Sequence, residues 1–256
     1  MIYIKNEEEI KKMEEACHIV ALCHIAIGEN IKAGMSTMDL ENIVMDVLKK
    51  NNAKPSFKGQ EGFEGSIPYP YAICVSINEE VIHGMPSKKR IIQDGDIVSV
   101  DIGAYKNGFH GDSAKTYMVG NVSDEAKRLV EVTRNSFYEG LKYAKVGYRV
   151  SDISHAIGAY VEKQGFNVVK EFQGHGVGRQ LHEDPGVPNY GKPGRGPRLE
   201  AGMTIAIEPM VNQGTDEIII EDDGWKVVTA DRKLSAHYEH TILITNNEPK
   251  LLTNRK

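Results

Sequence analysis

The segment Phe172-Gln-Gly-His-Gly-Val-Gly-Arg-Gln-Leu-His182 carries two histidines in a glycine-rich setting. His175 is flanked on both sides by glycine, so little neighbouring side-chain bulk shields its ring. Glycine lets the backbone approach other groups closely and adopt positive φ, and functional residues are frequent on loops held by a rigid scaffold. We therefore interpret the segment as a functional loop that presents its imidazoles. A turn that contains two histidines without a function is the competing interpretation.

Three carboxylates stand inside or beside segments that have the composition of buried strands: Asp101, Glu208 and Glu239. Asp101, for example, lies within Ile97-Val-Ser-Val-Asp-Ile102. A carboxylate in a buried strand is costly unless it is paired or binds a metal. A strand end that faces water would explain any one of these acids alone. Three such acids in one chain favour a shared metal site.

A predicted hairpin brings a fourth acid to the same place. Asn107-Gly108 separates two strand-like segments and is a strong hairpin signal. If these two residues form the loop, Asp101 lies opposite Ala114, and Asp112 is its diagonal neighbour within about 7 to 8 Å. A turn shifted back by one residue makes the two aspartates directly opposed. Both registers place Asp101 and Asp112 on one face.

Carboxylates this close together repel one another unless a cation lies between them. One cation could serve, but the four acids and His175 supply enough ligands for two. Oxygen ligands with a single imidazole favour Mn(II), Fe(II) or Co(II), with zinc as an alternative, whereas a structural zinc site would be rich in cysteine. Two cations about 3.5 to 4 Å apart can hold a bridging water and lower its pKa. A metal-dependent hydrolase is the leading hypothesis.

Four helices are predicted in two pairs, because polar N-cap residues and acids precede helically spaced apolar residues. The expected ranges are 6–34, 36–51, 123–147 and 151–165. The two pairs recur at an offset of roughly half the chain, and strand-like sequence follows each pair. We therefore predict an α+β fold with related halves, about 1–120 and 121–256, and a cleft between them. Coincidence in the cap spacing is the alternative.

The second half contains further strand-like segments, at 167–172, 203–210, 217–221, 226–229 and 237–245. Residues 184–202 are rich in proline and glycine and are expected to lack regular secondary structure.

The composition argues against several classes of partner. The formal net charge of -5 provides no overall attraction for nucleic acid, and no apolar run approaches the ~20 residues that span a bilayer. The N-terminal segment is acidic where a signal peptide would be basic and then apolar. Three cysteines in a chain of 256 residues do not form a disulfide framework. We expect a soluble, cytoplasmic protein without nucleic-acid or membrane partners.

Residues 172–190 resemble the signature of type I methionine aminopeptidases, reading Phe172-Gln-Gly-His-Gly-Val-Gly-Arg-Gln-Leu-His182-Glu-Asp-Pro-Gly-Val-Pro-Asn-Tyr190. The similarity extends over essentially the whole chain and includes residues 76–84, 96–101 and 238–241. It implies the pseudo-twofold pita-bread fold, with a central antiparallel sheet covered by helices, in a single catalytic domain of residues 1–256. It also implies two divalent metal ions per chain, bound by Asp101, Asp112, His175, Glu208 and Glu239.

The resemblance further implies an activity, the removal of N-terminal methionine from nascent proteins and peptides whose second residue is small. Glu208 would accept and pass on the proton of the attacking water, His182 would stabilise the oxyanion, and His83 would position the scissile amide. The first side chain would bind where a thioether packs well against aromatic and sulfur groups, among Tyr69, Cys74, His83, His182 and Trp225. A nascent chain is the implied partner, with the ribosome as a candidate docking platform and a monomer as the working form.

One segment departs from the family pattern. The family commonly has Gly-Tyr-x-Gly-Tyr-Pro before the strand of Cys74, whereas this chain has Phe63-Glu-Gly-Ser-Ile-Pro-Tyr-Pro70. Tyr69 matches, but Ser66 stands where a second tyrosine is usual. The resemblance therefore leaves the rim of the substrate pocket near Ser66 unspecified.

Three other assignments compete with this one. A proline dipeptidase would use the same ligands, but such proteins usually carry a further N-terminal domain. Type II methionine aminopeptidases usually have an added helical segment in the second half, for which this chain has no room. A non-catalytic binding module of the same fold would tend to lose ligands, and all five are present here.

Overall fold

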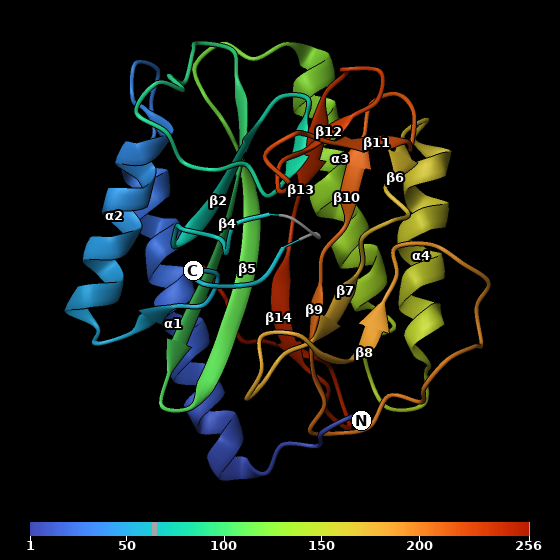
Figure 1. Cartoon of the computed structure of the whole chain (residues 1–256). Helices are drawn as coiled ribbons and strands as arrows, with labels where there is room; N and C mark the ends of the chain where they lie inside the picture. Colours follow the sequence, from blue (N-terminus) through green and yellow to red (C-terminus); the bar gives the residue numbers. More distant parts are fainter. Residues whose placement is uncertain (63–65, 256) are drawn as a thin grey trace.

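A computed structural model describes residues 1–62 and 66–255 (Figure 1). The helices are α1 (Glu7–Asn30), α2 (Thr37–Lys50), α3 (Asp124–Leu141) and α4 (Val150–Lys163). The strands are β1 (Lys54–Pro55), β2 (Ile73–Ile77), β3 (Glu80–Ile82), β4 (Ile97–Lys106), β5 (Phe109–Met118), β6 (Asn167–Val168), β7 (Gly174–Gly176), β8 (Glu183–Val187), β9 (Thr204–Ile207), β10 (Met210–Asn212), β11 (Ile218–Ile220), β12 (Val227–Thr229), β13 (Ser235–His237), β14 (His240–Leu243) and β15 (Lys250–Leu251).

The helices begin where side chains satisfy the free backbone N–H groups. At α1, Asn6 Oδ1 accepts from the Glu9 N–H at 3.0 Å, and the Glu9 carboxylate accepts from the Asn6 N–H at 2.9 Å. The start of α2 repeats this capping box. α4 begins one residue before its predicted start, because the Asp152 carboxylate accepts from the Arg149 N–H at 2.7 Å. α3 ends before its predicted limit; the chain turns, and the Val146 N–H donates to the Thr245 carbonyl.

The predicted hairpin forms with the Asn107-Gly108 loop. Both loop residues have positive φ, 51° and 87°, as a type I′ turn requires. The register pairs Asp101 with Ala114, which is the first of the two predicted registers and makes Asp112 the diagonal neighbour of Asp101. β4 also pairs with β1 and β2, and the resulting four-stranded sheet belongs to the first half of the chain.

Three residues of the histidine- and glycine-rich segment, Gly174–Gly176, form strand β7, so the interpretation of the segment as a loop is wrong there. The rest of residues 172–182 belongs to none of the described helices or strands. β7 lies between β9 and β8 in the five-stranded sheet β15-β14-β9-β7-β8. A Cβ at Gly174 would lie 2.3 Å from the Ala206 carbonyl oxygen, and one at Gly176 would lie 2.3 Å from that of Asp184. Neither glycine has a positive φ. Close approach of the neighbouring strands therefore excludes a side chain at both positions.

The prediction that residues 184–202 lack regular structure is wrong at their start. β8 covers Glu183–Val187 and contains Pro185. Proline cannot donate a ladder hydrogen bond, but β8 is the edge strand of its sheet and needs none on its outer side. The chain from there to β9 contains none of the described helices or strands.

Two predicted strands are each divided, and the divisions lie at two of the acids. Glu208 and Pro209 separate β9 from β10, since Pro209 has no N–H to continue the ladder. Tyr238 and Glu239 separate β13 from β14. β9 pairs with β14 and β10 pairs with β13. The two breaks therefore lie opposite each other, and Glu208 and Glu239 face each other between the β9–β14 and β10–β13 pairs.

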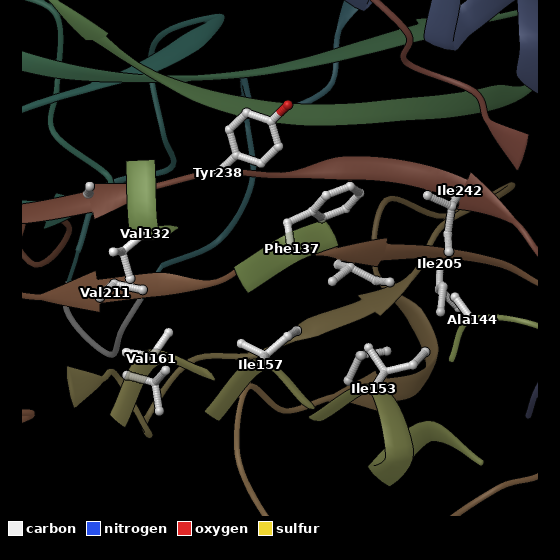
Figure 2. Close-up of a cluster of buried hydrophobic side chains, with 14 of the residues drawn as sticks. Val132, Phe137, Ala144, Ile153, Ile157, Val161, Ile205, Val211, Tyr238 and Ile242 are labelled. Atoms are coloured by element: carbon white, nitrogen blue, oxygen red, sulfur yellow. The ribbon is translucent and has the colours of Figure 1, made fainter. Parts of the chain in front are cut away.

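Each helix pair covers the sheet of its own half (Figure 1). In the first half α1 and α2 pack against β2 and β4. In the second half Figure 2 shows Phe137 of α3 and Ile157 of α4 facing Ile205 of β9 and Ile242 of β14. Each fully buried aliphatic or aromatic side chain contributes about 1.5 to 3 kcal/mol. These two cores hold the strands that carry the predicted site.

β5 joins the two halves along a seam with residues 237–241. The Glu239 N–H donates to the Ala114 carbonyl at 2.9 Å. The Thr241 hydroxyl donates to the Asp112 carbonyl at 2.7 Å and accepts from the Asp112 N–H at 3.1 Å. The seam places Asp112 of the first half next to Glu239 of the second.

All three cysteines, Cys17, Cys23 and Cys74, are buried and free. Of the described helices, none combines the length and apolar character that crossing a membrane requires.

Candidate metal centre and substrate pocket

One cavity of about 360 Å³ brings together all ten residues predicted for the site. Its lining includes Tyr69, Cys74, His83, Asp101, Asp112, His175, His182, Glu208, Trp225 and Glu239. The acids and His175 come from β4, β5, β7 and the two strand breaks, so both halves of the chain contribute. The cavity therefore lies where the sequence predicts a cleft, between the halves.

Asp112, His175 and Glu239 form the most compact part of this site. One potential ligand atom of each lies within 4.8 Å of those of the other two. His175 Nδ1 lies 2.9 Å from the Gly176 carbonyl oxygen. Because a carbonyl only accepts, Nδ1 carries the proton and Nε2 presents its lone pair to the acids. His175 Nε2 lies 3.4 Å from Glu208 Oε1 and 3.8 Å from Asp112 Oδ2.

The acids of the site are buried or partly buried, and the described protein atoms leave some of their oxygens without a hydrogen bond. Asp101 Oδ1, Asp112 Oδ1 and Glu239 Oε1 have no hydrogen-bond partner among the described residues. Unpaired buried polar atoms destabilise the fold by about 1 to 3 kcal/mol each. Carboxylate oxygens that converge on one imidazole nitrogen form a donor set for a divalent cation such as Mn(II), Fe(II) or Co(II). The residues present therefore fit a metal centre.

Burial also perturbs the protonation of these groups. It raises the pKa of Asp101 to about 7, with a further upward contribution from the charge of Glu208. Burial raises the pKa of Glu208 to about 8. Burial and the charge of Asp101 raise the pKa of Asp112 well above its usual range, and burial and the charge of Asp112 do the same at Glu239. Without a cation, the protein therefore holds several of these acids protonated near neutral pH.

His83 lies at the junction between the acids and an apolar pocket. Its backbone φ of 61° lies in the left-handed region, which is uncommon for a residue with a side chain. Such strain, about 1 to 3 kcal/mol, clusters at functional sites. The ring lies 5.7 Å from that of Phe172 and 5.9 Å from that of Trp225, and Nδ1 is buried without a partner among the described residues. Burial lowers its pKa to about 4, so the imidazole is neutral.

The opposite end of the cavity is apolar. It is formed by one cluster of buried side chains, Phe57, Tyr69, Cys74, Leu181 and Trp225. The Tyr69 hydroxyl donates to the Ile73 carbonyl at 2.9 Å, and the Trp225 Nε1–H donates to the Ile67 carbonyl at 2.8 Å. The two rings meet edge to face at 4.9 Å. Both polar groups are satisfied by backbone, so the rings present apolar surface to the cavity.

His182 lies at the mouth of the cavity. Its side chain is exposed, and its ring centroid is 4.4 Å from that of His175 at an interplanar angle of 79°. His175 and His182 therefore face the same space, with His175 partly buried among the acids and His182 exposed to solvent.

The sequence matches the metallopeptidase family M24 over residues 11–246. The chain belongs to this family. Membership makes it a metal-dependent hydrolase and accounts for the donor set described above.

This M24 metallopeptidase is similar to well-characterised members over its full length. It is 54% identical over 253 residues to methionine aminopeptidase 1 of Bacillus subtilis, and the match covers 99% of both chains. The crystal structure of methionine aminopeptidase from Thermotoga maritima has a TM-score of 0.95 and 48% identity, covering 99% of this chain and 100% of that one. These similarities confirm the resemblance found in the sequence and the predicted pseudo-twofold pita-bread fold.

A likeness to prolidases is more distant. Prolidase from Pyrococcus furiosus has a TM-score of 0.74 and 25% identity, and the match covers 99% of this chain but 66% of that one. The match therefore spans about two thirds of that prolidase's length.

Tyr69, from the segment that departs from the family pattern, lines the pocket. Residues 63–65 of that segment lie outside the described residues. Ser66 and Trp225 both lie against Gly62, where a Cβ would come within 2.4 Å of Ser66 Oγ and 2.6 Å of the indole. Ser66 therefore packs at the edge of the apolar pocket, beside Trp225.

Several residues of this metallopeptidase site were not predicted from the sequence. Phe57 and Leu181 complete the apolar pocket. His237 is buried, and its Nε2 lies 3.6 Å from Glu208 Oε2. A local signal existed for His237, because it precedes Glu239 by two residues and residues i and i+2 of an extended chain share a face. No comparable signal marks Phe57, which is remote in sequence from the acids.

Proposed function

We propose that this M24 metallopeptidase removes the N-terminal methionine from nascent proteins and peptides whose second residue is small. One observation carries the proposal: a single cavity joins the cluster of acids around His175 to an apolar pocket. Methionine is unbranched, and its thioether packs favourably against aromatic and sulfur groups. Tyr69, Cys74 and Trp225 supply such groups beside the acids.

We propose that Asp101, Asp112, His175, Glu208 and Glu239 hold two divalent ions, Mn(II), Fe(II) or Co(II), with Zn(II) as an alternative. The unpartnered buried oxygens and the free lone pair of His175 Nε2 support this assignment. Divalent ions in such a site lower the pKa of water and polarise a carbonyl group. The chain's own side chains then orient the substrate and move protons.

Glu208 is the proposed proton carrier. Its Oε1 faces the candidate metal centre, 3.4 Å from His175 Nε2, where a carboxylate can accept a proton from water. It takes a proton from the attacking water and passes it to the leaving amine. The substrate's free amino group is anchored among the acids, which explains why the enzyme acts only at a chain end.

His83 and His182 are proposed to act on the scissile peptide bond. His83 lies between the acids and the apolar pocket, where its neutral ring can hydrogen-bond the scissile amide and position it. His182 lies at the mouth, where it can donate to the oxygen on which negative charge develops. Tyr69, Cys74 and Trp225 hold the first side chain.

The substrate class implies that the partner is the N-terminus of a nascent chain in the cytoplasm. The ribosome is the corresponding docking platform, and a monomer is the proposed working form. Direct contact with nucleic acid or membrane is not part of this proposal.

Activity on defined peptides tests the proposal. The protein is purified, stripped of metal and reloaded with Mn(II), Co(II) or Fe(II), and the metal content is measured. We expect methionine to be released from Met-Ala-Ser and not from Met-Leu-Ser. Release of the first residue from X-Pro dipeptides, without activity on Met-Ala-Ser, would reassign the protein as a prolidase. Failure to bind any divalent ion would leave only a binding function.

A further inference from the structure

The imidazole of His237 faces the candidate metal centre without a hydrogen-bond partner at Nε2 among the described residues. The residue is 2% exposed, so bulk solvent does not reach this nitrogen. The distance from His237 Nε2 to the carboxylate oxygen Glu208 Oε2 is 3.6 Å. Buried polar atoms in proteins nearly always have a hydrogen-bond partner. An unpaired one that faces a metal centre indicates a hydrogen bond that forms when the metal ions are bound.

The position of His237 is fixed by its backbone. Its N–H donates to Thr116 Oγ1 at 3.0 Å, and the Thr116 hydroxyl donates to the His237 carbonyl at 2.9 Å. Ser99 Oγ lies 2.8 Å from Thr116 Oγ1 and holds the threonine in place. In the β10–β13 pair His237 is the partner of Met210, two residues beyond Glu208. The imidazole is thus held diagonally across from Glu208 by the strand framework.

Glu208 lies between two imidazoles that differ in whether their Nε2 can donate a hydrogen bond. Its Oε1 is 3.4 Å from His175 Nε2, and its Oε2 is 3.6 Å from His237 Nε2. His175 donates through Nδ1 to the Gly176 carbonyl, so its Nε2 has no proton for Glu208. Among the described residues His237 Nε2 has no hydrogen-bond partner, so it can carry a proton. Of the two rings, His237 is therefore the one that can donate to Glu208.

We propose that His237 is a positioning residue for Glu208. Its Nε2–H donates to Glu208 Oε2 and holds the carboxylate so that Oε1 is presented to the metal centre beside His175. The present separation exceeds a charge-assisted N–H···O distance of about 2.7 to 2.9 Å by less than an ångström, which a small rotation of the Glu208 side chain removes. The inference rests on the proposed function in one respect, the assignment of Glu208 to the metal centre.

His237→Phe and His237→Gln test this role. Phenylalanine keeps a planar ring but has no donor, whereas the glutamine amide can donate to Glu208. Loss of a hydrogen bond that orients a metal ligand lowers metal affinity by about 10- to 100-fold. We expect His237→Phe to weaken Mn(II) binding, measured by competition with a fluorescent chelator, by this factor. It should also lower kcat on Met-Ala-Ser while KM changes less than about twofold, and His237→Gln should recover most of both.

A double-mutant cycle with Glu208→Gln separates this role from a general structural one. If His237 acts through Glu208, His237→Phe has no further effect on Mn(II) affinity in the Glu208→Gln background. Tyr238→Phe is the matched control, since Tyr238 adjoins His237 but bonds Tyr138 and His240 instead; its Mn(II) affinity should equal that of the wild type. Thermal unfolding of each metal-free variant establishes that it is folded.

Two results would overturn the inference. One is wild-type Mn(II) affinity and kcat in His237→Phe; the other is an equal effect of His237→Phe with and without Glu208→Gln. A changed Co(II) absorption spectrum in His237→Gln, indicating loss of a nitrogen ligand, would also count against it and identify His237 as a direct ligand. Failure of the proposed function is distinct, because the wild type itself would then bind no divalent ion or spare Met-Ala-Ser.

Discussion

Cys74 and Asp101 are direct partners in the antiparallel β2–β4 pair. Adjacent strands lie about 4.7 to 4.9 Å apart. The pairing therefore fixes Cys74, which lines the apolar pocket, next to Asp101 of the candidate metal centre. Burial, followed by the charge of Asp101, raises the pKa of the Cys74 thiol well above its usual range. Cys74 is therefore a neutral packing group and is unsuited to act as a nucleophile.

Replacing Cys74 with serine should weaken the binding of methionine. The hydroxyl is more polar than the thiol and would face the thioether without the favourable sulfur contact, which we expect to cost about 1 kcal/mol, or about fivefold in KM. Steady-state kinetics on Met-Ala-Ser would show a raised KM with kcat nearly unchanged. A large fall in kcat at constant KM would instead place Cys74 in the chemical step.

Glu208→Gln should nearly abolish turnover while leaving the fold intact. The amide cannot accept the proton of the attacking water, and general acid–base catalysis contributes about 10²- to 10⁴-fold. The metal-free variant should be about as stable as the wild type near neutral pH, because Glu208, with a pKa of about 8, is largely protonated there and the amide replaces a neutral group. Kinetics on Met-Ala-Ser and thermal unfolding check the two parts separately. Unchanged turnover would exclude Glu208 as the base.

The stability of the metal-free protein should fall as pH rises from about 4 to about 8. Asp101 and Glu208 have folded-state pKa values of about 7 and about 8, above their unfolded values, so over this range the folded state holds protons that the unfolded state has released. Where the folded state binds more protons, the free energy of unfolding decreases with pH. Urea unfolding of chelator-treated protein at several pH values measures this slope.

Divalent ions should reverse that trend. They bind the ionised acids and displace the protons, so Mn(II) affinity should rise with pH from 6 to 8 and binding should release protons. Calorimetry in buffers of different ionisation enthalpy counts those protons. Metal affinity that is independent of pH over this range would show that the acids are already ionised in the metal-free protein.

Gly176→Ala should destabilise the protein through backbone crowding. A Cβ there would lie 2.3 Å from the Asp184 carbonyl oxygen, so β7 and β8 must separate, at a cost of about 3 kcal/mol. Gly28→Ala in α1 is the control, because its Cβ would meet only Tyr117 Cε1 at 3.5 Å. Removing a helical glycine should stabilise by up to about 1 kcal/mol. Equal unfolding midpoints for the two variants would contradict this account of the glycines.

Features of the fold that depend on residues close together in the sequence were predictable from it. Asn6 with Glu9 marks the start of α1, because capping uses residues three apart. Asn107-Gly108 sets the hairpin register, because only certain residues adopt positive φ at both loop positions. The shared face of Asp101 and Asp112 follows from that register. In each case the physical cause lies within a few residues.

The residues of the site were also identifiable, because acids in apolar strands contradict their surroundings. Asp101, Glu208 and Glu239 stood out for that reason, and the resemblance to a known family added His83, His182 and the pocket residues. All of them line the same cavity, although their catalytic roles remain proposals.

The sequence by itself determined the local elements, the hairpin register and which acids needed a common partner. Only the tertiary structure decided that the glycines around His175 form a strand between two others, that Glu208 and Glu239 lie at coincident strand breaks, and that His237 faces Glu208. These features depend on contacts between segments far apart in the chain, such as Asp112 with Thr241 across 129 residues. The periodicity and turn chemistry of one segment carry no information about the distant backbone against which it packs.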